Sequence, residues 1–453
     1  MSQLIQKYNV PGPRYTSYPT VPFWDNSSYN ETDWIHSLQN TFRQTNTTEG
    51  ISLYIHLPYC ESLCTFCGCN KRITKNHEVE EVYIKAVLKE WQLYRSLFSE
   101  QPRIAEIHLG GGTPSFFAPQ MLQLLIEGIL QDASFAETIE FGFEGHPNNT
   151  SYEHLKTLYD LGFRRVSFGV QDYDPTVQKA IHRIQPFAHV KQVTEWSRAI
   201  GYESISHDLV FGLPFQTLAG IEDTILKTIE LRPDRLAFYS YAHVPWIKGN
   251  GQRGFRDEDL PAATLKRELY EKGRTLFEQH GYVEIGMDHF ALPSDSLYKA
   301  MESGKLNRNF MGYTTTQSKV LLGLGVSSIS DVWTAFSQNV KDIDSYQEML
   351  TNGQFPLLRG HILTEEDITI RQQILNIICH FETSWEDSLF PLEEAFALQE
   401  RLVPFVEDKL IKLSDNKLVV LPEGRPFVRN ICMAFDKRML TSETTQRLFS
   451  QTV

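Results

Sequence analysis

The chain lacks a long apolar run, an excess of positive charge and a repeated segment. No uninterrupted hydrophobic stretch among its 453 residues approaches the roughly 20 residues that a membrane-spanning helix needs. Residues 1–7 lack the apolar core of a signal peptide, so we expect a cytoplasmic protein. The formal net charge of −13 argues against general nucleic-acid binding. An anionic substrate would therefore need local cations, because the overall field repels it.

Cysteine is also scarce, and four of the six cysteines lie in one short loop, residues 60–69. Cys60, Cys64 and Cys67 follow a C-x₃-C-x₂-C spacing, which is typical of radical S-adenosylmethionine (SAM) enzymes. Three thiolates can hold three irons of a [4Fe–4S] cube and leave the fourth open, whereas electron-transfer clusters normally use four cysteines. A zinc site is an alternative, but zinc ligands usually come as two pairs, and Cys379 and Cys432 are distant and unpaired. A disulfide knot is disfavoured in a large chain without a secretory signal.

The pattern of apolar residues predicts an α/β fold. From residue 52 onward, short apolar runs alternate with longer helical patterns, which predicts a parallel sheet with helical crossovers. Six such units are too few for a closed eight-stranded barrel, so we expect a partial (β/α)₆ barrel. The expected strands are 53–57, 104–109, 139–144, 165–170, 204–211 and 235–241, and the expected helices include 79–97, 119–131, 152–161 and 189–200.

Three regions are expected along the chain. Residues 1–47 should be irregular, because four prolines between positions 11 and 22 prevent long helices. Residues 48–363 should form the catalytic domain, with a barrel core at about 50–245 and an extension of helices and glycine-rich loops. Residues 364–453 should be mainly helical, with a capping box at Thr364 before helix 368–380 and a hairpin near 410–420. A DNA-reading role for this last region is disfavoured, because it carries 15 acidic against 10 basic residues.

Each expected strand ends in a chemically unusual group. In parallel α/β barrels the active site lies at the carboxyl ends of the strands. In strand 53–57, alternation turns Tyr54 and His56 toward the lumen and the leucines and isoleucine toward the helices. Tyr54 could equally be a hydrogen-bonded core tyrosine.

Three further strand ends carry candidate ligand-binding groups. The glycines at 110–112 let a ligand approach the backbone closely, although a plain glycine-rich turn is the alternative. Glu144 ends the third strand in an apolar run, which disfavours a surface role. Asp208 lies inside an apolar strand, where a carboxylate is costly unless it is hydrogen-bonded or has a function.

Together these segments resemble the oxygen-independent coproporphyrinogen III oxidase family of radical SAM enzymes. The similar segments span nearly the whole chain: 7–20, 60–70, 110–114, 169–172, 241–245, 286–290, 308–310, 312–315 and 429–432. The chain departs from the family pattern at Gly145-His146, where an Asp is commoner, and at Met311, where a Gln is commoner.

The resemblance implies a [4Fe–4S] cluster held by Cys60, Cys64 and Cys67, and two bound SAM molecules. It assigns Tyr54, Gly111, Glu144 and Ile329 to the cluster-bound SAM. It assigns a second set to the other SAM: Phe66, Gly112, Thr113, Gln171, Arg183, Asp208 and Ala242. Cys69 would not be a cluster ligand, and the resemblance makes Cys69, Tyr54 and Glu144 catalytic.

The implied reaction is the anaerobic oxidative decarboxylation of two propionates of coproporphyrinogen III to vinyl groups, giving protoporphyrinogen IX in porphyrin and haem biosynthesis. A 5′-deoxyadenosyl radical, generated from SAM at the cluster, would start it, with electrons from a reductase or small carrier. We expect a monomer in which Arg14 and Arg308 contact the tetracarboxylate substrate, although surface solvation is an alternative for both. The proline-rich segment 11–20 should close over the barrel.

Two other functions remain open at this stage. One is a haem-binding or haem-trafficking relative without the enzymatic activity, which we expect to lack both the 14–19 segment and Cys69. The other is a radical SAM enzyme that acts on a different tetrapyrrole.

Overall fold

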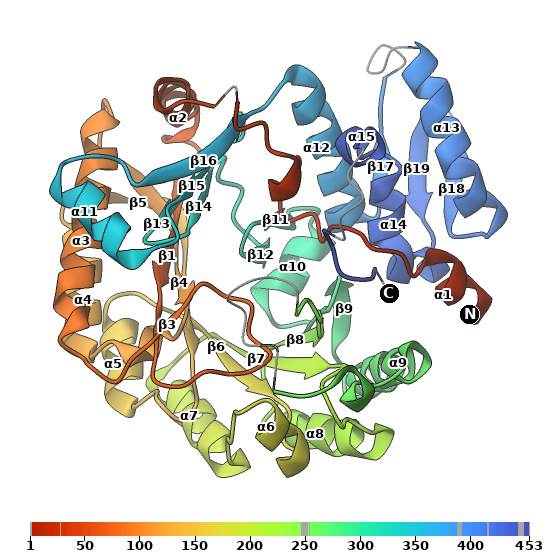
Figure 1. Cartoon of the computed structure of the whole chain (residues 1–453), viewed down its shortest axis with the longest axis horizontal. Helices are drawn as coiled ribbons and strands as arrows, with labels where there is room; N and C mark the ends of the chain where they lie inside the picture. The colour runs from red at the N-terminus through yellow and green to blue at the C-terminus, as the bar shows by residue number, and fades with distance from the viewer. Residues whose placement is uncertain are drawn as a thin grey trace.

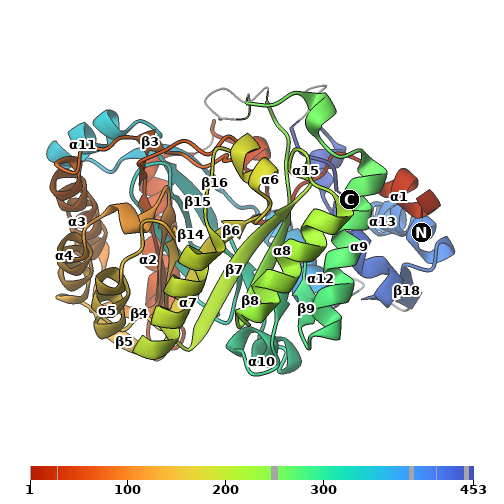
Figure 2. The same ribbon diagram turned by 90° about the horizontal axis from the view of Figure 1, so that it is seen from below.

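One large mixed sheet forms the body of the protein, and helices cover its outer face (Figure 1, Figure 2). The computed structural model describes residues 2–27, 29–245, 252, 254–386, 392–414, 416–442 and 448–452. Within these ranges the sheet has twelve strands. No helix in them combines the length and the apolar character that a membrane span requires.

The centre of the sheet is parallel, as the alternating pattern predicts. All six predicted strands are confirmed and lie side by side in chain order: β1 (Ile51–Leu57), β4 (Arg103–Gly111), β5 (Ser134–Gly145), β6 (Arg165–Gln171), β7 (Ser204–Phe211) and β8 (Arg235–Ser240). The four predicted helices are confirmed as α3 (Val79–Leu97), α4 (Pro119–Leu130), α5 (Tyr152–Asp160) and α7 (Phe187–Ile200). Further helices on this side are α6 (Pro175–Ala180), α8 (Leu218–Glu230) and α9 (Ala263–Gln279).

The extension contributes strands to both edges of the sheet, which the sequence did not indicate. A seventh parallel strand, β13 (Val320–Leu324), pairs with β1. Three antiparallel strands continue that edge: β14 (Ile329–Asp331), β15 (Ala335–Asn339) and β16 (Leu357–Ile362). At the other edge β10 (His289–Ala291) and β9 (Val283–Gly286) follow β8. The remaining elements here are α10 (Ser296–Glu302), β11 (Asn307–Asn309), β12 (Gly312–Thr314) and α11 (Ile343–Thr351). The sheet is therefore wider than six units.

Alternation along β1 separates the hydrophobic core from the lumen. Leu53, Ile55 and Leu57 are fully buried and belong to the cluster that packs against the outer helices. Tyr54 and His56 face the other way, as predicted, and line a cavity next to the cysteine loop. The side-chain period of two in a strand thus divides packing from chemistry.

The C-terminal region contains the predicted helix and hairpin. Helix α12 (Glu365–His380) begins at Thr364, whose hydroxyl accepts a hydrogen bond from the Asp367 backbone N–H in a capping box. The hairpin of β18 (Ile411–Ser414) and β19 (Lys417–Val420) is extended by β17 (Glu382–Ser384). Helices α13 (Leu392–Glu407), α14 (Val428–Met433) and α15 (Lys437–Leu440) complete it.

The N-terminal region is less irregular than we expected. Helix α1 (Ser2–Tyr8) precedes the prolines, and the 15-residue helix α2 (Glu31–Thr45) follows them. Helix α2 forms because the last of these prolines is Pro22 and because the Asn30 side chain caps its first turn by accepting from the Asp33 N–H. The prolines therefore exclude long helices only from the first part of the region.

Between these helices the N-terminal segment packs on the C-terminal region. The ring of Tyr8 stacks on Phe405 with 5.0 Å between centroids. Tyr15 is 2% exposed and donates a 2.9 Å hydrogen bond to Asp436. The Arg429 guanidinium donates to the backbone carbonyl of Pro13 at 2.9 Å. This segment is thus part of a folded core rather than a loose strap.

Candidate active site

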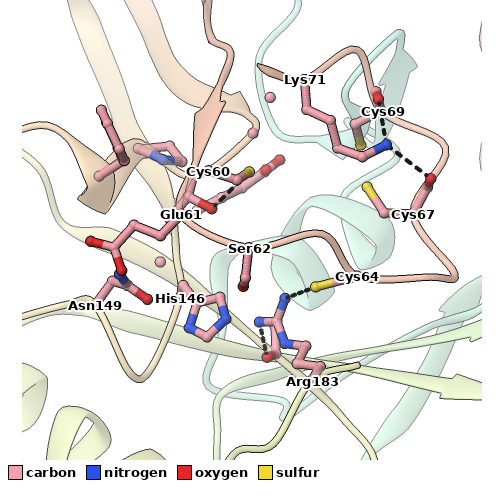
Figure 3. A pocket seen from close by; sticks show the side chains of 18 of the residues that line it. Cys60, Glu61, Ser62, Cys64, Cys67, Cys69, Lys71, His146, Asn149 and Arg183 are labelled. Carbon is pink, nitrogen blue, oxygen red and sulfur yellow. Dashed lines mark hydrogen bonds between the residues drawn. The ribbon is translucent and has the colours of Figure 1, made fainter. Parts of the chain in front are cut away.

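Three cavities join at the carboxyl ends of the central strands, and Glu144 lines all of them. The loop cavity holds about 920 Å³ of empty space, including its open mouth, and is bounded by the cysteine loop (Figure 3). The side cavity, about 1330 Å³, lies beside it and is lined by Tyr54 and His56. The lumen cavity, about 700 Å³, lies inside the barrel. The predicted strand ends therefore lie around three adjoining cavities that share Glu144.

The cysteine loop is held at its base and by its neighbours. Short strands β2 (Tyr59–Cys60) and β3 (Arg72–Ile73) pair and close the loop. The Thr65 hydroxyl donates to the Ala180 carbonyl at 2.9 Å. The Lys71 amine donates to the carbonyls of Cys67 and Cys69 at 3.2 and 3.3 Å (Figure 3). The strand pair at its base and these hydrogen bonds fix the loop, whose thiols line the cavity.

Cys60, Cys64 and Cys67 line the loop cavity, as does Cys69. All four thiols are free, which excludes a disulfide in this loop. No three His, Cys, Asp or Glu side chains in the described part of the chain gather around one metal-ion position, so the zinc alternative has no donor set there. Thiolates of a [4Fe–4S] cube each bind a different iron and need not converge on one point. The three thiols on one wall of an open cavity fit such a cluster.

The glycine run closes tightly against the base of the loop. The N–H of Gly112 donates to the Leu57 carbonyl at 2.9 Å, and a Cβ at Gly112 would lie 2.7 Å from the Pro58 carbonyl carbon. Gly111 has a φ of +114° and a Cβ there would meet the His56 ring at 2.8 Å. Glycine is needed at both positions, because any side chain would collide with strand β1 or the residue that follows it.

Tyr54, His56 and His108 form a polar cluster on the lumen face of β1 and β4. The Nε2 of His56 lies 2.9 Å from the Asn70 carbonyl and its Nδ1 lies 3.1 Å from the Tyr54 hydroxyl. Burial lowers the pKa of His56, so the neutral ring donates to Asn70 through Nε2 and accepts from Tyr54 through Nδ1. The Nε2 of His108 lies 3.3 Å from the Glu144 carboxylate. These contacts hold Tyr54 and Glu144 in place around the shared space.

Six of the seven residues assigned by resemblance to a second SAM line the loop cavity. Arg183 donates to the Gly169 carbonyl at 2.6 Å and to the Cys64 sulfur at 3.8 Å (Figure 3). Asp208 accepts a 2.8 Å hydrogen bond from Ser167, and burial raises the pKa of Asp208 to about 7. Gln171, Gly112 and Thr113 share this wall, and Phe66 borders it as well. One end of the Gln252 side chain bridges two of the predicted positions, donating to the carbonyls of Phe66 and Ala242 at 3.1 and 3.0 Å.

Four predicted residues are not among those that line the joined cavities. One is Ala242, although its carbonyl accepts the hydrogen bond from Gln252 described above. Ile329 is buried on β14, although its neighbours Ser327 and Ser328 line the side cavity. Arg14 lines a separate cavity and pairs with Asp288 at 2.7 Å. Arg308 lines another separate cavity and is 7% exposed. The structure therefore does not bring Arg14 and Arg308 to the space around the cysteine loop.

Other lining residues were not singled out from the sequence. His108 could have been found by the same alternation that found Tyr54, since Ile107 and Leu109 flank it in β4. Inside the lumen, Arg165 approaches Glu140 at 3.3 Å and Arg235 pairs with Asp295 at 2.7 Å. These ion pairs join residues far apart in the sequence, so no local pattern indicates them. The departures from the family pattern fall at the site: His146 lines the loop cavity and Met311 the lumen cavity.

Comparison with known proteins agrees with this geometry. A family model described as the Radical SAM superfamily matches residues 54–227. An oxygen-independent coproporphyrinogen III oxidase from Pseudomonas aeruginosa is 38% identical over 464 residues, covering 100% of this chain and 98% of that protein. Its namesake from Escherichia coli is 34% identical and covers 99% of this chain and 98% of its own length. A solved structure of coproporphyrinogen III oxidase from Escherichia coli, a radical SAM enzyme, superposes with a TM-score of 0.89 at 33% identity, covering 96% of this chain and 98% of that one.

Proposed function

Since this chain belongs to the oxygen-independent coproporphyrinogen III oxidase family of radical SAM enzymes, we propose that it converts two propionates of coproporphyrinogen III to vinyl groups without oxygen. The product would be protoporphyrinogen IX. The observation that carries the proposal is that the three spaced thiols and most of the family's SAM-binding positions line two adjoining cavities that share Gly111 and Glu144. The test is turnover of coproporphyrinogen III by the purified protein under anaerobic reduction. A protein that cleaves SAM but leaves this substrate unchanged would contradict it.

The cysteine loop would hold a [4Fe–4S] cluster through Cys60, Cys64 and Cys67. When bound there, the cluster and SAM supply the one-electron chemistry that removes a hydrogen atom from an unactivated carbon. The Thr113 hydroxyl lies 3.3 Å from the Cys60 sulfur and can donate to its thiolate. The Arg183 guanidinium near Cys64 adds positive charge that stabilises a second thiolate.

Cys69 would not bind iron but would take part in turnover. Cys69 is exposed. The space beside the preceding residue, Gly68, is also open, because a Cβ added there would have no heavy atom within 4 Å. Single changes to Ser at Cys60, Cys64 and Cys67 should each abolish the brown absorbance after anaerobic reconstitution. Cys69→Ser should keep the absorbance and the iron content but lose turnover. Loss of the cluster in the Cys69 variant would overturn its separate role.

Two SAM molecules would occupy the joined cavities. The first would lie among Tyr54, Gly111 and Glu144 on the side-cavity wall, with Ile329 at its edge. The second would lie against Gln171, Arg183 and Asp208 in the loop cavity. Tyr54 and Glu144 would be catalytic residues, because they would contact the first SAM, which is the molecule that reacts. Support comes from the two cavities meeting at Gly111 and Glu144, since each has its own polar wall.

Equilibrium dialysis with radiolabelled SAM tests the number of sites. We expect a stoichiometry near two per chain in the reconstituted wild type, falling toward one in Asp208→Ala. Removing this carboxylate takes away a partner for the positive ammonium or sulfonium group of SAM. A wild-type value of one would contradict the second site.

The electron source would be a reductase or small carrier that docks near the cysteine loop. Glu61, Ser62 and Leu63 in that loop are exposed, so a partner can come close to the thiols. We further propose that the enzyme is a cytoplasmic monomer, since each residue assigned above comes from a single chain. If the reconstituted protein turns over with dithionite but no protein donor supports turnover, this docking role is contradicted.

A further inference from the structure

If the proposed function holds, the substrate brings four carboxylates into a chain of net charge −13. Such a substrate needs local cations to offset the repulsion. The two arginines chosen from the sequence lie in other cavities: Arg14 is already paired with Asp288, and Arg308 lines a separate space. The cations that receive the substrate must therefore be sought elsewhere on the joined cavities.

The side cavity is the only one of the three joined cavities with two lysines on its described walls. Lys71 and Lys341 line it, and Glu144 is the one carboxylate there. Pockets for ligands of drug size are typically about 300–1,000 Å³, and the water-accessible part of this cavity, about 600 Å³, falls within that range. Glu144 also lines the other two cavities, whereas Lys341 lines this one alone, so the lysine lies away from their junction.

Lys341 is held beside the cysteine loop, with Arg359 close to it. It follows β15, and its carbonyl accepts a 3.0 Å hydrogen bond from the Asn70 side chain. Arg359 on β16 donates through Nε to the Gln338 side chain at 2.8 Å, and Gln338 itself lines the cavity. The Gln338 amide is fixed in turn by donating to the Ser327 carbonyl at 3.1 Å. This chain of contacts orients a guanidinium directly behind the cavity wall.

The two cations are not offset by a carboxylate. No ion pair within the described ranges includes Lys341 or Arg359, although the nearby Arg72 pairs with Asp344 at 3.0 Å. Burial first, and then the Arg359 charge, lower the pKa of Lys341. Lys71, by contrast, uses its amine to hold two carbonyls of the cysteine loop. An anion bound at Lys341 would relieve a repulsion with Arg359 that the protein alone leaves uncompensated.

We propose that Lys341, with the charge of Arg359 behind the cavity wall, forms a propionate-binding subsite that holds the tetrapyrrole by its side chains that do not react. Glu144, at the junction of the cavities, repels carboxylates, so the ring system would place its anchored propionates toward Lys341. The reacting propionate would then point toward the junction and the cysteine loop. This subsite positions substrate and takes no part in the bond changes.

The test compares Lys341→Gln with Lys412→Gln in the reconstituted holoenzyme. Lys412 is an exposed lysine on β18 of the C-terminal sheet and lines none of the cavities named here. Its substitution therefore removes the same charge at a position away from the site. Lys341 lies at the surface, where solvent screens part of its charge, so the expected change in affinity is about tenfold. The KM for coproporphyrinogen III should rise about tenfold in Lys341→Gln and stay unchanged in Lys412→Gln.

Binding without turnover separates this subsite from the activity. Fluorescence titration with coproporphyrin III, which carries the same four propionates, should show about tenfold weaker binding to Lys341→Gln. Salt should weaken binding to the wild type more steeply than to this variant, because one screened charge is gone. The KM for SAM should not change in either variant, and matching thermal melting curves would show that both fold.

Three results would overturn the subsite. They are equal porphyrin affinity in Lys341→Gln and wild type, an equal loss in Lys412→Gln, and a rise in the KM for SAM rather than for the porphyrinogen. The last would mean that the carboxylate held there belongs to SAM. If the wild type and Lys341→Gln both turn over coproporphyrinogen III normally, the subsite alone is refuted. If the wild type is inactive, the proposed function is refuted.

Discussion

Asp208→Asn should stabilise the protein without cofactors at pH 8 and leave it unchanged near pH 4. Asp208 lies on β7 facing the cavities, and Ser167 is the one described residue that donates a hydrogen bond to it. Burial raises its pKa from 3.8 to about 7. Because the folded state holds the proton more tightly than the unfolded state does, the stability that this proton contributes is complete below about pH 4. It is lost as pH rises through 7.

The size of the effect follows from that difference in pKa. At about 1.4 kcal/mol for each pKa unit, the ionised carboxylate costs at most about 4 kcal/mol at pH 8. The cavity admits water, so screening should reduce this to about 2 kcal/mol. An Asn amide oxygen can still accept from Ser167, and its neutrality removes the cost. The same change should weaken SAM binding, so this position would trade stability for function.

Thermal melting of the protein without cofactors at pH 4.5 and pH 8 measures the effect, with Asp172→Asn as the matched control. Asp172 accepts hydrogen bonds from Gln216 at 2.6 Å and Thr224 at 2.9 Å. The side-chain N–H₂ of an Asn at this position would face one of these donors and could not accept from it. Asp172→Asn should therefore lower the melting temperature at both pH values. An Asp208→Asn variant that melts with the wild type at pH 8 would refute the reasoning, because it would show a fully hydrated carboxylate.

Three further changes test other parts of the structure. Gly110→Ala would place a Cβ 2.9 Å from the Glu144 carboxylate, so we expect at least a tenfold loss of SAM affinity in dialysis, and an unchanged affinity would show that Glu144 is not needed there. Glu90→Ala removes the acceptor of the Gly325 N–H at 2.8 Å and of the Tyr346 hydroxyl at 2.6 Å, and should cost about 3 kcal/mol in stability; a melting curve like that of the wild type would contradict this. Arg14→Gln breaks the link between the N-terminal segment and Asp288, and it should leave dithionite-driven SAM cleavage intact while slowing formation of protoporphyrinogen IX, whereas a normal rate would show that the segment does not close the site.

The sequence alone predicted what depends on local pattern. The C-x₃-C-x₂-C spacing identified the loop, since ligand spacing is set within a few residues of chain. Alternation placed Tyr54 in the lumen and Leu53 in the core, because the side-chain period of a strand is two in any tertiary context. The capping box at Thr364 likewise marked the start of α12 from four adjacent residues.

Tertiary structure alone decided what depends on distant pairing. Strand β13 joins β1 across more than 260 residues, and its five-residue apolar run carries no sign of its partner. The same holds for the placement of cations, because a guanidinium such as Arg14 takes its role from the carboxylate that the fold brings to it. Residues on β15 and β16 reach the cysteine loop only through the added edge of the sheet, so Lys341 could be recognised only once that edge was in place. Local sequence sets backbone geometry and side-chain facing, whereas which faces meet is set by long-range packing.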